Sequence, residues 1–479
     1  MPVSSAFTPE SRFPSLGPEF ADPVRPAEFP APALRYRNDR AAGALGLDSL
    51  DDAEWMAAFG RFEPLADTDF PPLAKRYHGH QFRSYNAELG DGRGFLFAQL
   101  REDKTGRLID LGTKGSGQTP WSRNGDGRLT LKGAVREALA SEMLEALGVP
   151  TGRTLSVVET GEALVRHDEP SPTRGAVLVR SLWSHIRFGT FQRHAYFDRR
   201  DLLARLIDHV VEIYYPRLAD TRGEERVVTL LHAIVGRSAR LVARWMAAGF
   251  VHGVLNTDNL NITGESFDYG PYRFLPWYEP GFTAAYFDET GLYAYGRQPE
   301  AVFWNLQQLA ACFALVVEDH APLIDALNSY SDAYHDALRD AFTARLGLKR
   351  RTPDEDTALT VSALHLLQTG GEALRWEPLF FDWFGGKTSE PRAMASARAP
   401  LYAGEAFEAF RAVLEPYEPA NPLAVVKPYF RRADPEEMLY PEIEAIWADI
   451  AERDDWSAFH AKLARVETAR KAYGLDPWV

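Results

Sequence analysis

Residues 252–270 read HGVLNTDNLNITGESFDYG and carry three side chains suited to metal binding or proton transfer. Asn259 offers an amide oxygen and Asp268 a carboxylate, and both are hard oxygen ligands that suit Mg²⁺ when phosphate oxygens complete its shell. Asp258 is the one carboxylate between His252 and Asn259, and it could accept the proton of an incoming hydroxyl. A loop or capping carboxylate is the alternative for Asp258. The stretch therefore predicts a site for chemistry on phosphate groups.

The same stretch resembles the catalytic loop of protein kinases, H-R-D-L-x-x-x-N, followed by D-F-G. His252, Leu255 and Asn259 match the His, Leu and Asn of the loop, and Asp268 opens a D-Y-G. The catalytic aspartate of the motif falls on Val254, which cannot transfer a proton. The pattern thus keeps the metal ligands of a kinase and lacks its base at the usual position.

A glycine-rich segment, LGDGRG at residues 89–94, joins two strand-like stretches. Gly90 and Gly92 would let backbone N–H groups approach a phosphate closely, and Arg93 adds a bidentate phosphate donor. A simple hairpin turn is the alternative, because an Asp-Gly pair between strands is typical of one.

Lys114 ends a strand-like run, and Glu137 lies on the helix that follows. In kinases a strand lysine contacts the phosphates of the nucleotide and pairs with a helix glutamate. The spacing here allows the same pair, although a surface lysine and a solvated glutamate would give the same pattern. The chain order of glycine loop, lysine, glutamate, asparagine and D-Y-G strengthens the nucleotide interpretation.

Two further segments could complete a nucleotide pocket. Asp126 and Gly127 belong to a turn, RNGDGR, that leads into the helix and could contact a nucleotide beside it. Arg180 and Arg187 stand seven residues apart in VRSLWSHIRFGTF and could grip a polyphosphate. Two surface arginines are the alternative.

The chain has 479 residues, of which 45% are hydrophobic and 25% charged, with a formal net charge of −14. This composition is typical of globular proteins, and the acidic balance argues against a nucleic-acid partner. The single cysteine, Cys312, excludes an intramolecular disulfide and favours a reducing compartment. No secretory signal or membrane-spanning apolar run is present in the sequence, so we expect a cytoplasmic protein without a membrane partner.

The distribution of elements predicts an α+β fold with the two lobes of a protein kinase. Short apolar runs at 94–100, 107–114, 154–160 and 175–182 indicate strands, and residues 131–147 repeat an apolar side chain every fourth position, as a helix does. From about residue 199 the patterns are mostly helical. We expect four parts: an N-terminal extension that wraps the core (1–76), a strand-rich N-lobe (77–185), a mostly helical C-lobe with the catalytic loop (186–350), and a helical C-terminal extension (351–479).

Taken together, the motifs resemble the selenoprotein O family, also called the YdiU family, of protein adenylyltransferases with a kinase-like fold. The stretches that carry the resemblance lie across residues 77–310 and include YHGHQF, LGDGRG, KGSGQTPWSRNGDGR, VRSLWSHIRFGTF and GFVHGVLNTDNLNITGESFDYGPYRF. The resemblance implies that ATP binds flipped relative to kinases, with its α-phosphate facing the acceptor. AMP would then pass to a Ser, Thr or Tyr hydroxyl of a protein, which could include this chain itself.

The resemblance also implies a role for each candidate residue. Asp258 would be the proton acceptor, and Asn259 and Asp268 would bind Mg²⁺ or Mn²⁺. The residues that would hold ATP are Gly90, Gly92, Arg93, Lys114, Glu137, Asp126, Gly127, Arg180, Arg187 and Asp268. Three other functions stay open at this point: phosphoryl transfer as in kinases, transfer of UMP or another nucleotide with Mn²⁺, and a non-catalytic scaffold that only binds nucleotide.

Overall fold

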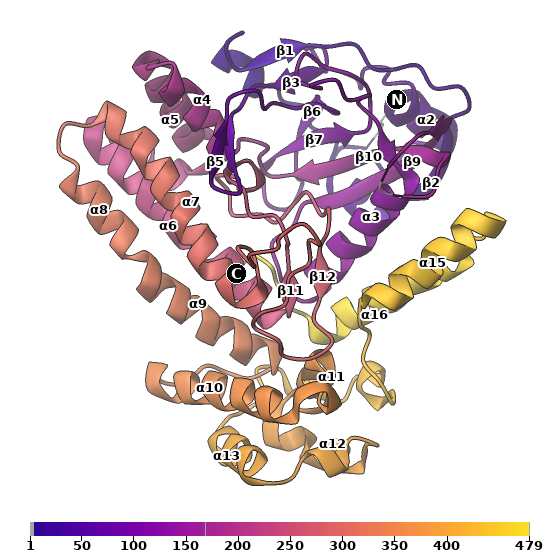
Figure 1. Cartoon of the computed structure of the whole chain (residues 1–479), viewed down its shortest axis with the longest axis vertical. Helices are drawn as coiled ribbons and strands as arrows, with labels where there is room; N and C mark the ends of the chain where they lie inside the picture. Colours follow the sequence, from indigo (N-terminus) through magenta and orange to yellow (C-terminus); the bar gives the residue numbers. More distant parts are fainter. Residues whose placement is uncertain (1–3, 168, 479) are drawn as a thin grey trace.

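An antiparallel sheet dominates the N-terminal part of the chain in the computed structural model, which describes residues 4–167 and 169–478 (Figure 1). Its strand order is β1-β3-β6-β7-β10-β9-β2, and β8 pairs with β10. The strands are β1 (Ala21–Pro23), β2 (Ala33–Arg37), β3 (Leu73–Lys75), β6 (Leu96–Arg101), β7 (Leu108–Lys114), β8 (Leu129–Thr130), β9 (Arg153–Leu164) and β10 (Thr173–Leu182). A separate hairpin consists of β4 (Gly79–Gln81) and β5 (Ser84–Asn86).

The sheet is covered on both faces, and this explains why its central strands β7 and β10 are buried along almost their whole length. Along β10, Val177 and Val179 pack into a cluster with α1 (Asp39–Ala44) and α2 (Asp52–Gly60). The alternate residues Ala176 and Leu178 belong to the main core, which includes α3 (Leu131–Ala146). The strands and the helix predicted from residue patterns are thus present, each within a few residues of its expected bounds.

Helix α3 begins and ends where its sequence allows. The Thr130 side chain accepts a hydrogen bond of 3.2 Å from the Gly133 N–H, which caps the first turn. Gly148 follows the helix with a φ of +78°, a conformation that suits glycine, and Pro150 prevents continuation. Most residues of α3 are buried, so this helix is part of the core and not a surface element.

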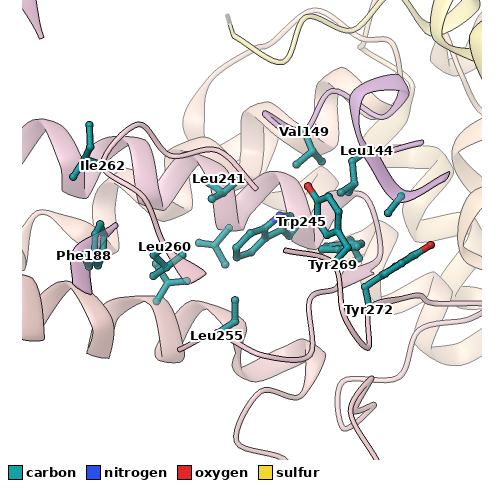
Figure 2. Close-up of a cluster of buried hydrophobic side chains, with 14 of the residues drawn as sticks. Leu144, Val149, Phe188, Leu241, Trp245, Leu255, Leu260, Ile262, Tyr269 and Tyr272 are labelled. Carbon is teal, nitrogen blue, oxygen red and sulfur yellow. The ribbon is translucent and has the colours of Figure 1, made fainter. Parts of the chain in front are cut away.

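The second lobe is built from helices α4 (Phe188–Tyr196), α5 (Arg200–Tyr214), α6 (Gly223–Ala247), α7 (Gln298–Phe313), α8 (Ala321–Asn328) and α9 (Tyr330–Arg345). Strands β11 (Phe250–Val251) and β12 (Arg273–Phe274) pair with each other and bracket the stretch that follows β11. Leu255, Leu260, Ile262 and Tyr269 from this stretch belong to the same buried cluster as Trp245 of α6, and Figure 2 shows Tyr269 beside the Trp245 ring. These anchors hold the backbone while the polar residues between them remain available to a cavity.

The C-terminal helices continue away from the sheet and then return to it (Figure 1). The outgoing helices are α10 (Pro353–Gly370), α11 (Trp376–Asp382), α12 (Glu390–Ala395), α13 (Glu405–Leu414) and α14 (Pro422–Val425), and the returning ones are α15 (Tyr440–Arg453) and α16 (Ser457–Tyr473). Both α15 and α16 pack against α3. The ion pair of 2.7 Å between Lys132 of α3 and Glu444 of α15 fixes this contact.

The predicted α+β fold with a strand-rich N-lobe and a mostly helical C-lobe is confirmed. The four-part division of the chain stays a prediction. Residues before 77 contribute β1, β2 and β3 to the main sheet, and the C-terminal residues cover α3. In the part of the chain that the structure describes, no helix combines the length and apolar character needed to cross a bilayer.

Candidate active site

A cavity of about 850 Å³ contains most of the predicted site residues. Most of its lining comes from segments that are far apart in sequence: the glycine loop 89–94, the end of β7, the turn at 121–128, the arginine of β10, the arginine before α4, and the stretch 254–271. Tyr77, Gln81 and residues 165–167 complete it. Glu137 does not line this cavity but contacts a residue that does. The chain therefore brings all the predicted site residues to one place.

Lys114 and Glu137 form the ion pair that their positions predict. The Lys114 ammonium contacts the Glu137 carboxylate, and it also lies 3.3 Å from Oδ1 of Asp268. Lys114 and Glu137 are only 6% and 4% exposed, which rules out the alternative of two solvated surface residues. Because β7 and α3 are both buried elements, the pair is rigidly placed.

Arg180 and Arg187 are also buried, and both contact Asp268. Arg180 Nη1 donates to Oδ1 of Asp268 at 2.5 Å, and Arg187 Nη1 donates to Oδ2 at 2.9 Å. Burial opposes ionisation of Asp268, but the charges of Arg180, Lys114 and Arg187 outweigh it and hold the pKa of this carboxyl well below its usual range. Three cations thus share one carboxylate at the inner end of the cavity.

The backbone before Asp268 is fixed by His252, which is fully buried. The His252 ring donates from Nε2 to the Phe267 carbonyl oxygen at 2.9 Å, and its backbone N–H donates to Oε1 of Gln298 at 3.0 Å. Asp268 itself has a φ of +60°, which is unusual for a residue with a side chain. A strained residue held by its surroundings is typical of a functional position.

Asp258 lines the same cavity and is 8% exposed. Its backbone carbonyl accepts a hydrogen bond of 2.7 Å from Arg187, but its carboxylate Oδ1 is buried without a hydrogen-bond partner among the described residues. Gly79 approaches closely enough that an added Cβ would stand 3.0 Å from this oxygen. Burial raises the pKa of Asp258 to about 6, with Arg187 opposing the shift. A carboxylate with a free oxygen and such a pKa suits proton acceptance near neutral pH.

Asn259 and Val254 lie next to each other at the cavity wall. The Asn259 side-chain N–H donates to the Val254 carbonyl oxygen at 2.9 Å, which orients the amide. Val254 therefore contributes backbone at the position where kinases have a catalytic aspartate. Asn259 and Asp268 are the two hard oxygen donors here. Among the described residues, no group of three or more His, Cys, Asp or Glu side chains is placed to hold a metal ion.

The glycine loop lies against the turn at 121–128. Ser122 Oγ donates to the Gly92 carbonyl oxygen at 2.6 Å, and a Cβ on Gly92 would stand 2.7 Å from the Trp121 carbonyl oxygen. A Cβ on Gly90 would meet the Trp121 ring at 2.3 Å, so side chains are excluded at both positions. The side chain of Arg93 is exposed at the cavity.

Asp126 and Gly127 both line the cavity, where Asp126 is exposed and paired with protein groups whereas Gly127 is buried. Arg166 donates to Oδ2 of Asp126 at 2.8 Å, and the Arg128 N–H donates to Oδ1 at 3.0 Å. Gly127 has a φ of +68°, and a Cβ there would lie 2.3 Å from backbone atoms of Gly117. The turn that the sequence indicates is present, and its side chain is engaged by arginine.

The structure adds residues that the motifs did not single out. Asp91, within LGDGRG, lies 3.6 Å from Arg187 and accepts a hydrogen bond of 3.1 Å from the Lys75 N–H. The Tyr77 ring lies 4.6 Å from the Arg187 guanidinium. Asn256 lines the cavity two residues before Asp258. The sequence does offer a signal for Asp91, because it is the one carboxylate within the glycine loop. Its partner Arg187 is evident only in the structure.

The family model described as protein adenylyltransferase SelO matches residues 4–467. The chain belongs to the SelO family. The family predicted from the motifs is thereby confirmed, and the match includes most of the C-terminal third, where motifs alone were less clear.

Individual relatives of this SelO-family chain are similar over three quarters of their length or more. A protein from Synechocystis sp. named protein nucleotidyltransferase YdiU is 43% identical over 478 residues, which are 96% of this chain and 98% of the relative. A protein of the same name from Gloeobacter violaceus is 44% identical over 476 residues, or 97% and 95% of the two chains. One from Pseudomonas putida is 40% identical over 374 residues, or 78% and 75%.

Proposed function

We propose that this protein transfers AMP from ATP to Ser, Thr or Tyr hydroxyls of protein substrates and releases pyrophosphate. The family and the names of the relatives support nucleotidyl transfer. The observation that carries the finer proposal is the inner end of the cavity, where Lys114, Arg180 and Arg187 share one carboxylate. Nε of Arg180 is also buried without a hydrogen-bond partner among the described residues.

These cations favour a phosphate tail, and not a nucleobase, at the inner end. A buried guanidinium needs anionic or carbonyl acceptors for its N–H groups, and an unpaired one destabilises the folded protein. The β- and γ-phosphates of ATP would supply those acceptors for Arg180, Arg187 and Lys114. The α-phosphate would then lie beside Asp258, whose Oδ1 has no hydrogen-bond partner among the described residues.

In the proposed step, the acceptor hydroxyl oxygen attacks the α-phosphorus, and the bond from that phosphorus to the bridging oxygen of pyrophosphate breaks. Asp258 takes the hydroxyl proton, and the arginines and Lys114 hold the leaving pyrophosphate. Mg²⁺ or Mn²⁺ would neutralise phosphate charge during such a transfer. Asn259 and Asp268 would hold that ion, because their oxygens line the cavity and phosphate oxygens can complete the shell.

Asp268 fits this role once a nucleotide is present. Without nucleotide both of its oxygens are engaged by cations. A phosphate tail that binds Lys114, Arg180 and Arg187 would release the carboxylate for the metal ion. We therefore expect nucleotide and metal to strengthen each other's binding.

The test compares ATP labelled at the α-phosphate with ATP labelled at the γ-phosphate, each incubated with Mg²⁺ or Mn²⁺ and with protein acceptors. The proposal predicts that label on protein comes from the α-position alone, and that Asp258→Ala abolishes it. Label from the γ-position alone would show phosphoryl transfer and refute the proposal. The same incubation with UTP, GTP and CTP identifies the preferred nucleotide, and self-labelling of the chain can be followed on the same gels.

A further inference from the structure

Four aromatic side chains gather on two loops next to the cavity, and we call them the mouth cluster: Phe82, Tyr286, Phe287 and Tyr293. Phe82, Tyr286 and Phe287 are 37%, 86% and 47% exposed, whereas Tyr293 is buried beneath them. The Phe82 ring lies 5.8 Å from the Phe287 ring and 5.0 Å from the Tyr293 ring, and the Tyr286 and Phe287 rings are 5.1 Å apart. Large aromatic groups in mutual contact and open to solvent are typical of interaction sites.

The mouth cluster is attached directly to the wall of the cavity. Oδ1 of Asn256, a lining residue, accepts a hydrogen bond of 3.0 Å from the Phe82 N–H and one of 2.9 Å from the Tyr293 hydroxyl. Gln81, next to Phe82, also lines the cavity. Asn256 is two residues from Asp258, so one short segment joins the exposed aromatic rings to the proposed proton acceptor.

The two-residue turn between β4 and β5 carries bulky residues where such turns normally have asparagine, aspartate or glycine. Strands β4 and β5 pair through Gln81 and Ser84, which leaves Phe82 and Arg83 as a two-residue turn. Their φ values are +50° and +63°. Turns with two positive φ values normally use Asn-Gly or Asp-Gly, because a side chain is unfavourable there. A phenylalanine held in this conformation points to a role for its side chain.

We propose that the mouth cluster binds an apolar side chain of the protein substrate, a few residues from the acceptor hydroxyl. The occupant is an extended segment of the substrate polypeptide whose hydroxyl enters the cavity toward Asp258. This inference rests on the proposed function and adds the substrate class: acceptor sites flanked by Leu, Phe or a similar residue. The exposed rings are complementary to such a side chain, and their attachment to Asn256 places it beside the reacting group.

The charges around the cluster agree with an apolar occupant. Arg83, the one basic residue of the turn, already pairs with Glu300 at 3.3 Å and its guanidinium lies 5.5 Å from the Trp304 ring. The cluster contributes four rings, the buried Tyr293 hydroxyl that is engaged by Asn256, and the exposed hydroxyl of Tyr286. An acidic flanking residue would therefore lose water without gaining a cation at the rings.

The experiment uses the full-length chain, α-labelled ATP and a synthetic peptide library. Each peptide carries one fixed Ser, Thr or Tyr, and each flanking position is scanned with Leu, Phe, Ala and Asp. The wild-type chain should label peptides with Leu or Phe at one flanking position with a kcat/KM ~10-fold above the Ala peptides. Phe287→Ala should remove most of that preference by raising KM, with kcat little changed.

Phe197→Ala is the matched control, because Phe197 is a 54% exposed phenylalanine that packs on Tyr196 and lies outside the cavity lining. It should keep the wild-type preference. ATP affinity and the release of pyrophosphate without peptide should be equal in wild type, Phe287→Ala and Phe197→Ala, which shows that the site and fold are intact. Phe82→Ala keeps the backbone N–H to Asn256 and should act like Phe287→Ala.

The outcomes separate the two proposals. Label on peptides without a flanking preference, or an equal loss in Phe287→Ala and Phe197→Ala, would overturn the mouth cluster as a docking site and leave AMP transfer standing. Label from the γ-position alone, or no label on any peptide with the wild-type chain, would overturn the proposed function and this inference with it.

Discussion

Replacing Asp258 with Asn should remove transfer activity and make the ligand-free protein more stable. The carboxylate is buried, one of its oxygens has no partner among the described residues, and burial raises its pKa to about 6 from the model-peptide value of 3.8. A carboxyl with a raised pKa binds protons more tightly in the folded state than in the unfolded state. Above its folded pKa, the ionised group therefore destabilises the fold.

The size of the effect follows from the shift. A change of roughly two pKa units corresponds to about 3 kcal/mol of lost stability above pH 6. As the pH falls from about 6 to about 4, the folded state takes up the proton first and the penalty disappears. Asp258→Asn should thus raise the free energy of unfolding by about 3 kcal/mol at pH 7.5 and by about 1 kcal/mol at pH 4.5.

Thermal and urea unfolding of the ligand-free protein in EDTA measure this difference, with wild type and variant compared at both pH values. Asp268→Asn is the matched control from the same cavity. Lys114, Arg180 and Arg187 hold the pKa of Asp268 well below its usual range, so its neutralisation should destabilise the protein at pH 7.5. The two Asp-to-Asn changes are therefore expected to have opposite signs.

A less stable Asp258→Asn variant, or a gain that does not shrink with falling pH, would refute the argument. It would mean that the Asp258 carboxylate is satisfied in the folded protein and serves as a structural group. A stabilised variant that keeps full transfer activity would instead separate the burial of Asp258 from its role as proton acceptor.

Three further substitutions test the rest of the site. Lys114→Met should weaken ATP binding at least ~10-fold in calorimetry, since it removes a phosphate donor and leaves the buried Glu137 with only the more distant Arg180, at 3.9 Å, as a cation. Arg187→Lys keeps the charge but loses the fork that reaches several acceptors, and should lower kcat at least ~10-fold in the α-label assay. Gly92→Ala should displace the loop from Trp121 and weaken ATP binding, and an unchanged Kd would show that the loop does not contact the nucleotide.

Much of the fold and of the site could be predicted from local patterns. The helix with an apolar residue at every fourth position packs that side into the core. The runs that became β7 and β10 are rich in apolar residues because helices cover both faces of the sheet. Lys114, Glu137 and Asp268 could be assigned to one site because their order along the chain matches the order of the corresponding kinase motifs. In the structure Lys114 contacts both of the others.

Other features depend on contacts between distant segments and leave no local signal. Nothing in the sequence around Arg187 shows that it reaches both Asp268 and the backbone of Asp258. The place of Phe82 beside Phe287 likewise results from a hairpin and a loop about 200 residues apart in the chain. The burial that raises the pKa of Asp258 is also a property of the packed cleft, not of its motif.

The return of α15 and α16 to α3 has a consequence for how activity can be controlled. Kinases switch by moving the helix that carries the glutamate of the Lys–Glu pair. Here that movement would have to break the Lys132–Glu444 contact and the bonds of Arg40 to Glu142 and Glu145. Helices α15 and α16 therefore hold α3, and with it Glu137, in the position where Glu137 pairs with Lys114. Deleting α15 and α16 should therefore loosen α3 and weaken the Lys114–Glu137 pair, so this segment supports the site although none of its residues lines the cavity.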